Sequence, residues 1–129
     1  AGEPTYVEAG FDPWISQAGA LIVLCTSESI YRERYAEPDK TRYHDGKWPV
    51  PWWWVDAGAA MQNLLLAAVD EGLAAGFLGI HAIDGLAQYL GIPDDVSPVG
   101  IITIGHPAPD RRSGSLDRGR RETVHREQW

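Results

Sequence analysis

The longest apolar block of the chain predicts its central element. Residues 54–75 contain no proline, and a helix over this stretch would be about 33 Å long. Its few polar side chains, among them Asp56, Asn63 and Asp70, recur every seven residues and share one narrow stripe. A helix that is apolar on most sides is buried on most sides. Because 129 residues can hardly surround it, we expect part of it to contact another subunit; a plain core helix is the alternative.

Shorter apolar runs predict the strands of a sheet. The run ALIVLCT at residues 20–26 has the pattern of a strand that is buried on both faces. The β-branched run VGIITI at residues 99–104 is the strongest strand signal of the chain. A tight turn and a short strand are expected at residues 75–80, directly after the long helix.

The remaining stretches predict short helices and loops. Residues 27–34 open with a serine suited to cap a helix, and residues 84–90 form a second short helical pattern before a glycine. Residues 1–17 have no clear periodicity and are expected to be irregular or briefly helical. Residues 37–51 are dense in proline, glycine and charge, which indicates an exposed loop. This loop is either a lid or a solvated connector.

Composition sets bounds on the class of protein. The length predicts one domain over residues 1–129. The single cysteine, Cys25, excludes an intrachain disulfide and lies in an apolar run, so we expect a reduced, structural thiol. No charged segment followed by an apolar one opens the chain, which argues against a signal peptide and for a cytoplasmic protein. Polar residues within the apolar block argue against a membrane span.

Charge is distributed unevenly along the chain. Residues 1–110 carry 5 Lys and Arg against 15 Asp and Glu, a net −10, whereas residues 111–129 carry 6 Arg against 3 acids, a net +3. An acidic body argues against general binding of nucleic acids. The tail arginines Arg118, Arg120 and Arg121 lie close together on a glycine-containing stretch and suit a phosphate. Charge complementarity with the acidic body is the alternative.

No catalytic motif stands out among the polar residues. The four histidines are scattered, so we predict no metal site. A nucleophile elbow, a P-loop and a dinucleotide-binding glycine motif are all missing from the sequence. Four of the six tryptophans lie within residues 48–54, where they predict either an aromatic pocket for a flat ligand or packing at a subunit interface.

A series of short motifs follows the start of the apolar block. They are, in order, QNLLLAA at 62–68, AIDG at 82–85, LGIP at 90–93, IGHPAP at 104–109 and the ending VHREQW at 124–129. Their order and spacing resemble the C-terminal two-thirds of the flavin (FMN)-dependent nitroreductase family, over about residues 11–129. The resemblance implies an α+β fold, with a small mixed sheet flanked by helices and a long central helix at the core of a homodimer.

The resemblance also implies a cofactor site. The backbone of the loop after the short strand would meet the flavin ring, and the tail arginines would hold the FMN phosphate. The residues that the resemblance assigns to the cofactor are Ala82, Ile83, Asp84, Gly85, Arg118, Arg120 and Arg121. The final strand would reach across to the partner. We assign no catalytic side chain, because in this family the cofactor carries the reaction.

The implied function is an FMN-dependent oxidoreductase that takes a hydride from NAD(P)H and reduces a nitroaromatic, a quinone or a similar small acceptor. The family also begins with an Arg-Ser-x-Arg segment and an Asn/Gln-Pro-Trp stretch, and neither is found here. The alternative is therefore a non-catalytic or incomplete assembly subunit. Such a subunit would bind flavin only beside a companion chain that carries the N-terminal segment.

Overall fold

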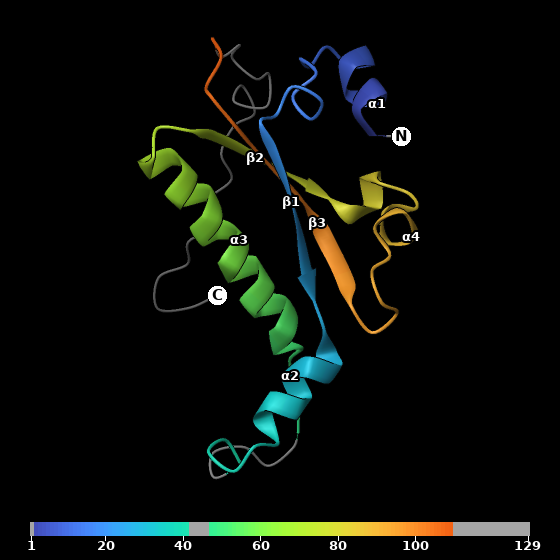
Figure 1. Ribbon diagram of the computed structural model, residues 1–129, viewed down its shortest axis with the longest axis vertical. Coiled ribbons are helices and arrows are strands. Elements are labelled where there is room, and N and C mark those ends of the chain that lie inside the picture. The colour runs from blue at the N-terminus through green and yellow to red at the C-terminus, as the bar shows by residue number, and fades with distance from the viewer. Residues whose placement is uncertain (1, 42–46, 110–129) are drawn as a thin grey trace, which may run out of the picture.

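The computed structural model of the chain describes residues 2–41 and 47–109. Its elements are, in order, α1 (Gly2–Glu8), β1 (Ala20–Thr26), α2 (Glu28–Tyr35), α3 (Trp52–Asp70), β2 (Ala74–Gly79), the 3₁₀ helix η1 (Ile80–Ala82), α4 (Leu86–Leu90) and β3 (Ser97–Gly105). The strands form one sheet, and the helices lie around it (Figure 1). This arrangement confirms the predicted α+β class.

The three strands form one sheet in the order β1-β3-β2. β3 pairs antiparallel with both neighbours, and Ile102 at its centre lies opposite Ile22 and Phe77. β1 and β2 therefore point the same way, but β3 lies between them, so no parallel pair forms among the described strands. The prediction of a mixed sheet was wrong for this part of the chain. The physical reason is that β3, the last strand in the sequence, lies between β1 and β2 and pairs antiparallel with each of them.

The core is centred on β3. Ile102 is fully buried, and Ile101 and Thr103 are also buried. The predicted strand at residues 99–104 is thus confirmed and extends by a few residues at its N-terminal end. The short strand after the long helix is confirmed as β2.

β1 differs from its prediction. Its side chains were expected to be buried on both faces, yet Leu21 is 51% exposed and Ile22 is also exposed. Successive side chains of a strand point to opposite faces of the sheet, so the exposure of Leu21 and Ile22 shows that neither face is fully covered at this end of β1. Cys25 is a free thiol and is exposed on this strand.

The long helix α3 starts and ends earlier than predicted. It begins at Trp52, directly after Pro51, and it ends at Asp70. Beyond its end, Gly72 has a φ of 72° and donates a hydrogen bond to the carbonyl of Val69 at 3.0 Å. The amide of Leu73 donates to the carbonyl of Ala68 at 2.8 Å. Together these two bonds form a Schellman motif, which ends the helix five residues before the predicted boundary.

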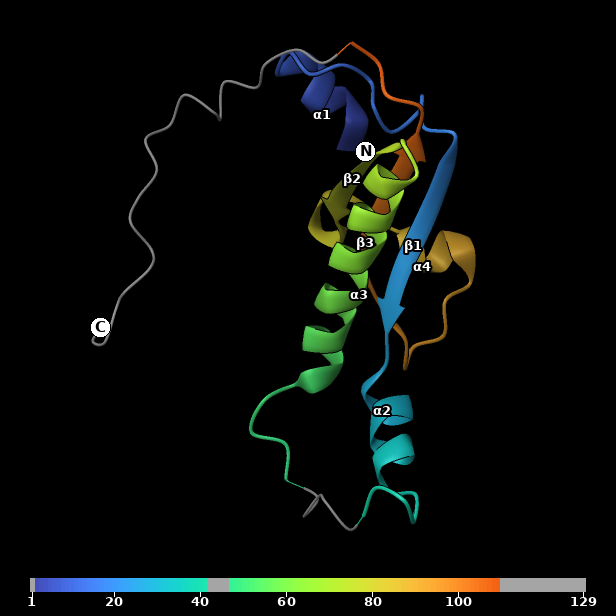
Figure 2. The ribbon, with the colours of Figure 1, turned by 90° about the vertical axis from the view of Figure 1, so that its left-hand side faces the viewer.

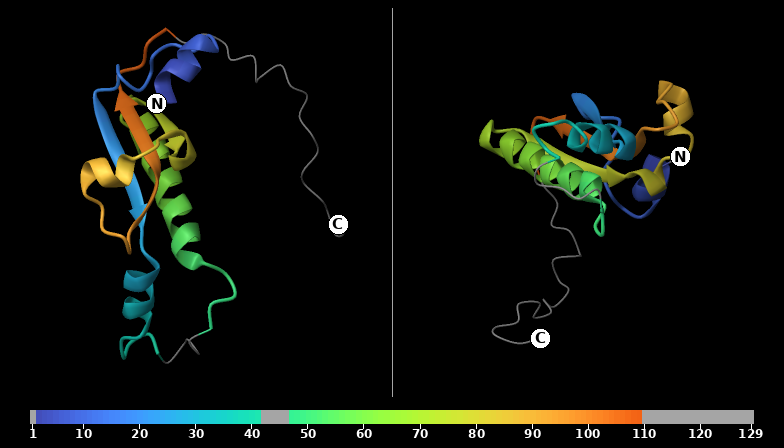
Figure 3. Two further views of the ribbon diagram at one scale, coloured as in Figure 1. Left: turned by 90° about the vertical axis from the view of Figure 1, so that its right-hand side faces the viewer. Right: turned by 90° about the horizontal axis from the view of Figure 1, so that it is seen from below.

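α3 packs on one face of the sheet, and α4 lies on the other side (Figures 2 and 3). Only Ala57 and Ala68 of α3 are buried within the single chain, and the burial of its other sides against another subunit stays a prediction. Side chains on the side away from Ala57 and Ala68 form a continuous exposed row, which we call the outer stripe. The outer stripe comprises Trp52, Val55, Ala59, Gln62, Leu66 and Val69.

The short helices follow their predictions closely. Ser27 caps α2, and its hydroxyl accepts a hydrogen bond from the Ile30 amide at 3.3 Å. The predicted helix at residues 84–90 is shorter than expected, since α4 begins at Leu86. The lead-in of the chain is briefly helical, as α1 shows. The predicted loop at residues 37–51 contains no helix or strand where it is described, and its role as a lid stays a prediction.

Candidate functional site

The predicted flavin-ring loop at residues 82–85 is a tight turn between η1 and α4. The amide of Ile83 donates to the carbonyl of Ile80 at 2.9 Å, which ends η1. Gly85 has a φ of 73°, a left-handed conformation that suits glycine, and it directly precedes α4. Asp84 and Gly85 are both exposed, and their amides donate no hydrogen bond to another described residue. The turn therefore presents two adjacent backbone donors to solvent.

The tail arginines that were predicted to hold the FMN phosphate lie outside the described residues, as does the final strand. The structure therefore does not bring Arg118, Arg120 and Arg121 together with the loop at residues 82–85. The described cations all belong to one short stretch, and they are Arg32, Arg34, Lys40 and Lys47. Arg32 pairs with Glu28 at 2.7 Å, and Arg34 pairs with Asp39 at 2.8 Å. A phosphate beside the loop would thus receive its cations from outside the described residues.

The clustered tryptophans divide into two groups. Trp48 packs against Tyr31 and Tyr35 of α2, at 5.2 and 5.1 Å between ring centroids, and Trp53 packs against Tyr31 at 6.2 Å. The guanidinium of Arg32 lies over both indole rings, at 5.7 and 5.6 Å from their centroids. The chain's own cation thus covers these two rings. Trp52 and Trp54 are exposed instead, which leaves packing at a subunit interface open for them.

This aromatic cluster joins α2 to the first turn of α3. The hydroxyl of Tyr31 lies 3.4 Å from that of Tyr35. Burial raises the pKa of Tyr31, and the hydrogen bond to Tyr35 and the nearby Asp56 carboxylate raise it further. The phenol therefore stays protonated at neutral pH and keeps its role as a donor. The Thr26 hydroxyl at the end of β1 also donates to the Trp53 carbonyl at 2.9 Å, which links β1 to α3.

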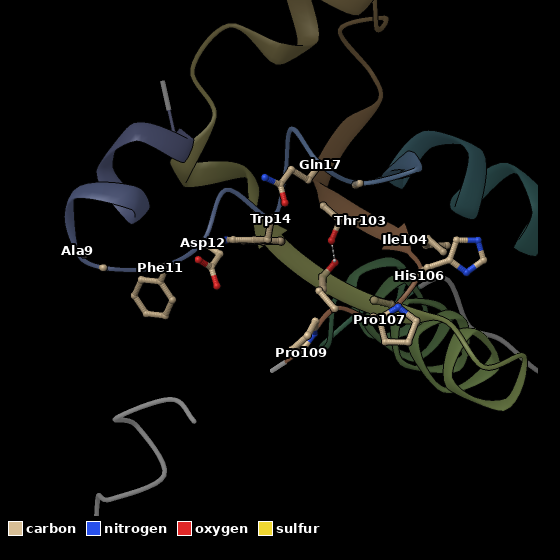
Figure 4. Close-up of a pocket in the computed structure, with 17 residues that line it drawn as sticks. Ala9, Phe11, Asp12, Trp14, Gln17, Thr103, Ile104, His106, Pro107 and Pro109 are labelled. Atoms are coloured by element: carbon tan, nitrogen blue, oxygen red, sulfur yellow. Dashed lines mark hydrogen bonds between the residues drawn. The ribbon is translucent and has the colours of Figure 1, made fainter. Parts of the chain in front are cut away.

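A groove of about 670 Å³ opens at the end of the sheet where β2 begins and β3 ends (Figure 4). Its wall is formed by the turn before β1, the start of β2 and the residues after β3. The side chains that matter most are Phe11, Asp12, Trp14, Gln17, Thr103 and His106. The described residues predicted for the cofactor, at positions 82–85, do not line this groove. The sequence held one signal for it, the Pro-Trp pair at residues 13–14, but nothing showed which strand the indole would meet.

α1 holds the turn that carries Trp14. The Glu3 carboxylate accepts hydrogen bonds from the amides of Ile15 at 2.7 Å and Ser16 at 2.8 Å. These bonds, the one from Ser16 first, hold the pKa of Glu3 below its usual value. Tyr6 of α1 also packs edge-on against Trp14, at 6.2 Å between ring centroids. The indole is therefore fixed from the side of α1.

Two further features bear on the kind of site. The described residues contain no group of three or more side chains arranged to hold a metal ion. His81 belongs to η1 and His106 to the groove, whereas the other two histidines lie outside the described residues. Across the described ranges, no helix combines the length and the apolar character that crossing a membrane requires.

The family to which this fold belongs is shown by comparison with known proteins. The model of the nitroreductase family matches residues 3–106. The chain therefore belongs to the nitroreductase family, which confirms the resemblance seen in the sequence. The Bacillus subtilis (strain 168) protein named FMN reductase (NAD(P)H) is 33% identical over 128 residues, which cover 93% of this chain and 49% of that protein. A protein of Archaeoglobus fulgidus, whose name includes NAD(P)H nitroreductase, is 28% identical over 92% of this chain and 63% of its own length.

A solved structure shows the same fold. Bacillus megaterium NfrA1 superposes with a TM-score of 0.63 over 98% of this chain and 53% of its own, at 23% identity. The chain thus spans about half to two-thirds of the length of the relatives it matches.

Proposed function

We propose that the chain is part of an FMN-dependent oxidoreductase that uses NAD(P)H to reduce a nitroaromatic, a quinone or a similar small acceptor in the cytoplasm. The observation that carries this proposal is the exposed turn at Asp84 and Gly85, whose two amides have no described partner. The name of the Bacillus subtilis relative, an FMN reductase, supports the choice of flavin. Bound FMN would supply the hydride chemistry, and the protein would supply position and electrostatics.

The residues of the loop would act through their backbone. Amide donors aimed at the ring stabilise negative charge that develops there during reduction, and they need no reorganisation to do so. Gly85 suits this task because it lacks a side chain that would keep a planar ligand from the backbone. Ala82, Ile83 and Asp84 would complete the edge that faces the ring. We assign no catalytic side chain to the reaction.

The phosphate of FMN would be held by Arg118, Arg120 and Arg121. This part of the proposal rests on their spacing in the sequence and on the family to which the chain belongs. It is also supported by the confinement of the described cations to residues 32–47, which leaves the loop without a basic side chain of its own. Guanidinium groups bind phosphate through paired, charge-assisted hydrogen bonds.

A homodimer formed through α3 is the proposed assembly. The outer stripe repeats with alternating spacings of three and four residues, which is the pattern of a helix that packs along another helix. It runs the length of α3 and carries no charged residue. A second copy would remove this stripe from water, and a two-fold axis would place each stripe against its equivalent.

A second function is favoured by one observation. The described lysines and arginines all lie within residues 32–47, so the loop at residues 82–85 has no basic side chain of its own. An incomplete assembly subunit, which binds flavin only beside a companion chain, would have this property. Every charged contact that is missing also leaves the remaining ligand less well oriented, so the affinity for FMN would fall steeply.

The test is flavin retention by the 129-residue chain alone. The purified chain is mixed with excess FMN and passed through a gel-filtration column, and the flavin absorbance of the protein peak is measured. We expect weak or no retention for this chain by itself. Tight one-to-one retention, with NAD(P)H-dependent reduction of a nitroaromatic, would show instead that the chain is a self-sufficient enzyme.

A further inference from the structure

We propose that the groove beside Trp14 is a second ligand site, which binds an uncharged, electron-poor aromatic molecule that carries nitro or carbonyl oxygens. This site is separate from the loop at residues 82–85, since none of those residues lines the groove. The proposed function is used only to narrow the ligand, because nitroaromatics and quinones are molecules of this kind. The binding itself requires neither flavin nor turnover.

The wall formed by Trp14 is preorganised for stacking. A Cβ atom at Gly76 would lie 3.0 Å from Cζ3 of the indole and 3.2 Å from Oγ1 of Thr103, so only glycine lets the ring approach the backbone of β2 this closely. Tyr6 and the hydrogen bonds of Glu3 hold the same turn from the side of α1. A ring that is already fixed loses little entropy when a ligand binds to it.

The chemistry of the lining selects the ligand. The indole face of Trp14 is electron-rich and attracts electron-poor rings, and Phe11, which is 52% exposed, adds a second aromatic surface. Gln17 is exposed and its amide can donate to a nitro or carbonyl oxygen. The described lining contains neither lysine nor arginine, so no described cation is available to an anionic ligand.

The size of the groove agrees with this class of ligand. Pockets for small molecules usually enclose roughly 300–1,000 Å³. The groove, at about 670 Å³, lies within that range, and Pro107 and Pro109 are among the residues that line it (Figure 4). The hydroxyl of Thr103 already donates to the carbonyl of Gly76 at 3.4 Å, so this buried group needs no hydrogen bond from the ligand.

The experiment observes Trp14 directly in flavin-free protein. The chain is labelled with 5-fluorotryptophan, the ¹⁹F signal of Trp14 is assigned with the variant Trp14→Phe, and 4-nitrobenzyl alcohol is added as the probe. We expect a saturable shift of the Trp14 signal. The exposed Trp52 and Trp54 serve as internal references and should move little. A Trp14 signal that does not move, or that moves linearly together with the reference signals, would overturn the proposal.

A pair of glycine variants tests the geometry. Gly76→Ala places a methyl group against the indole and should weaken probe binding by about tenfold, which corresponds to 1.4 kcal/mol. Gly58→Ala is the matched control, because a Cβ there meets nothing within 4 Å, and it should bind like the unaltered chain. Phe11→Ala, at an exposed position, gives an independent reading if Gly76→Ala does not fold. Unchanged affinity in every variant that folds would refute the site. Loss of FMN binding in a separate assay would bear only on the proposed function.

Discussion

Shortening Leu66 to alanine tests the dimer through the outer stripe. Leu66 is 59% exposed in the single chain, and burying a whole leucine side chain contributes about 1.5–3 kcal/mol. Covering the exposed part would therefore contribute about 1–2 kcal/mol per copy. Both copies in a two-fold dimer carry the substitution, so the free energy of association of Leu66→Ala should weaken by about 2–4 kcal/mol. This loss raises the dissociation constant by roughly 30-fold to several hundredfold.

The assay is sedimentation velocity over a range of protein concentrations. Leu64→Ala is the matched control, since Leu64 lies in the same helix but is half-buried on the side that faces the sheet. The control should lower the free energy of unfolding and leave the dissociation constant of the dimer nearly unchanged. A stable, folded monomer of the unaltered chain at micromolar concentration would falsify the dimer. Equal effects of the two leucine variants on association would show that α3 acts through the fold alone.

Three further predictions follow from the core, the tail and α1. Ile102→Ala should lower the free energy of unfolding by about 2–5 kcal/mol, because Ile102 is fully buried at the centre of the sheet, and urea denaturation would measure this. Replacing Arg120 and Arg121 by alanine should weaken the binding of FMN, in whichever assembly binds it, by about 1.5–3 kcal/mol for each charge-assisted bond lost; an unchanged titration would remove the tail from the site. The pKa of Glu3 is lowered in the folded chain, so its contribution to stability is present above its unfolded pKa and is lost as the pH falls through the folded pKa. Acid should therefore release the turn around Trp14, visible as a change in its ¹⁹F signal, and Glu3→Gln should abolish this acid transition at that signal.

The elements of the fold were largely predictable, because their signals are local. The capping hydroxyl of Ser27 acts three residues away, and the β-branched run of β3 favours a strand wherever it lies. The end of α3 was missed although Gly72 was visible in the sequence. An apolar pattern continued past this glycine, and only the backbone bonds after it show that the helix stops there.

The candidate site was predictable in part. The loop at residues 82–85 was found through its resemblance to a family, and the structure shows a turn in which Asp84 and Gly85 are exposed and their amides donate to no other described residue. The groove was missed, because Trp14 and Gly76 are far apart in the sequence and meet only through the packing of the sheet.

What the sequence determined by itself is the set of elements, the acidic body and the family. What only the tertiary structure decided is which residues become neighbours. An apolar strand such as β1 predicts burial, but its exposure depends on whether other elements cover its two faces. Five of the six residues of the outer stripe of α3 are apolar, and they lie on the side of the helix away from its buried residues Ala57 and Ala68. Burial is a property of the whole arrangement of elements, so a local pattern predicts the need for a partner without specifying which surface provides it.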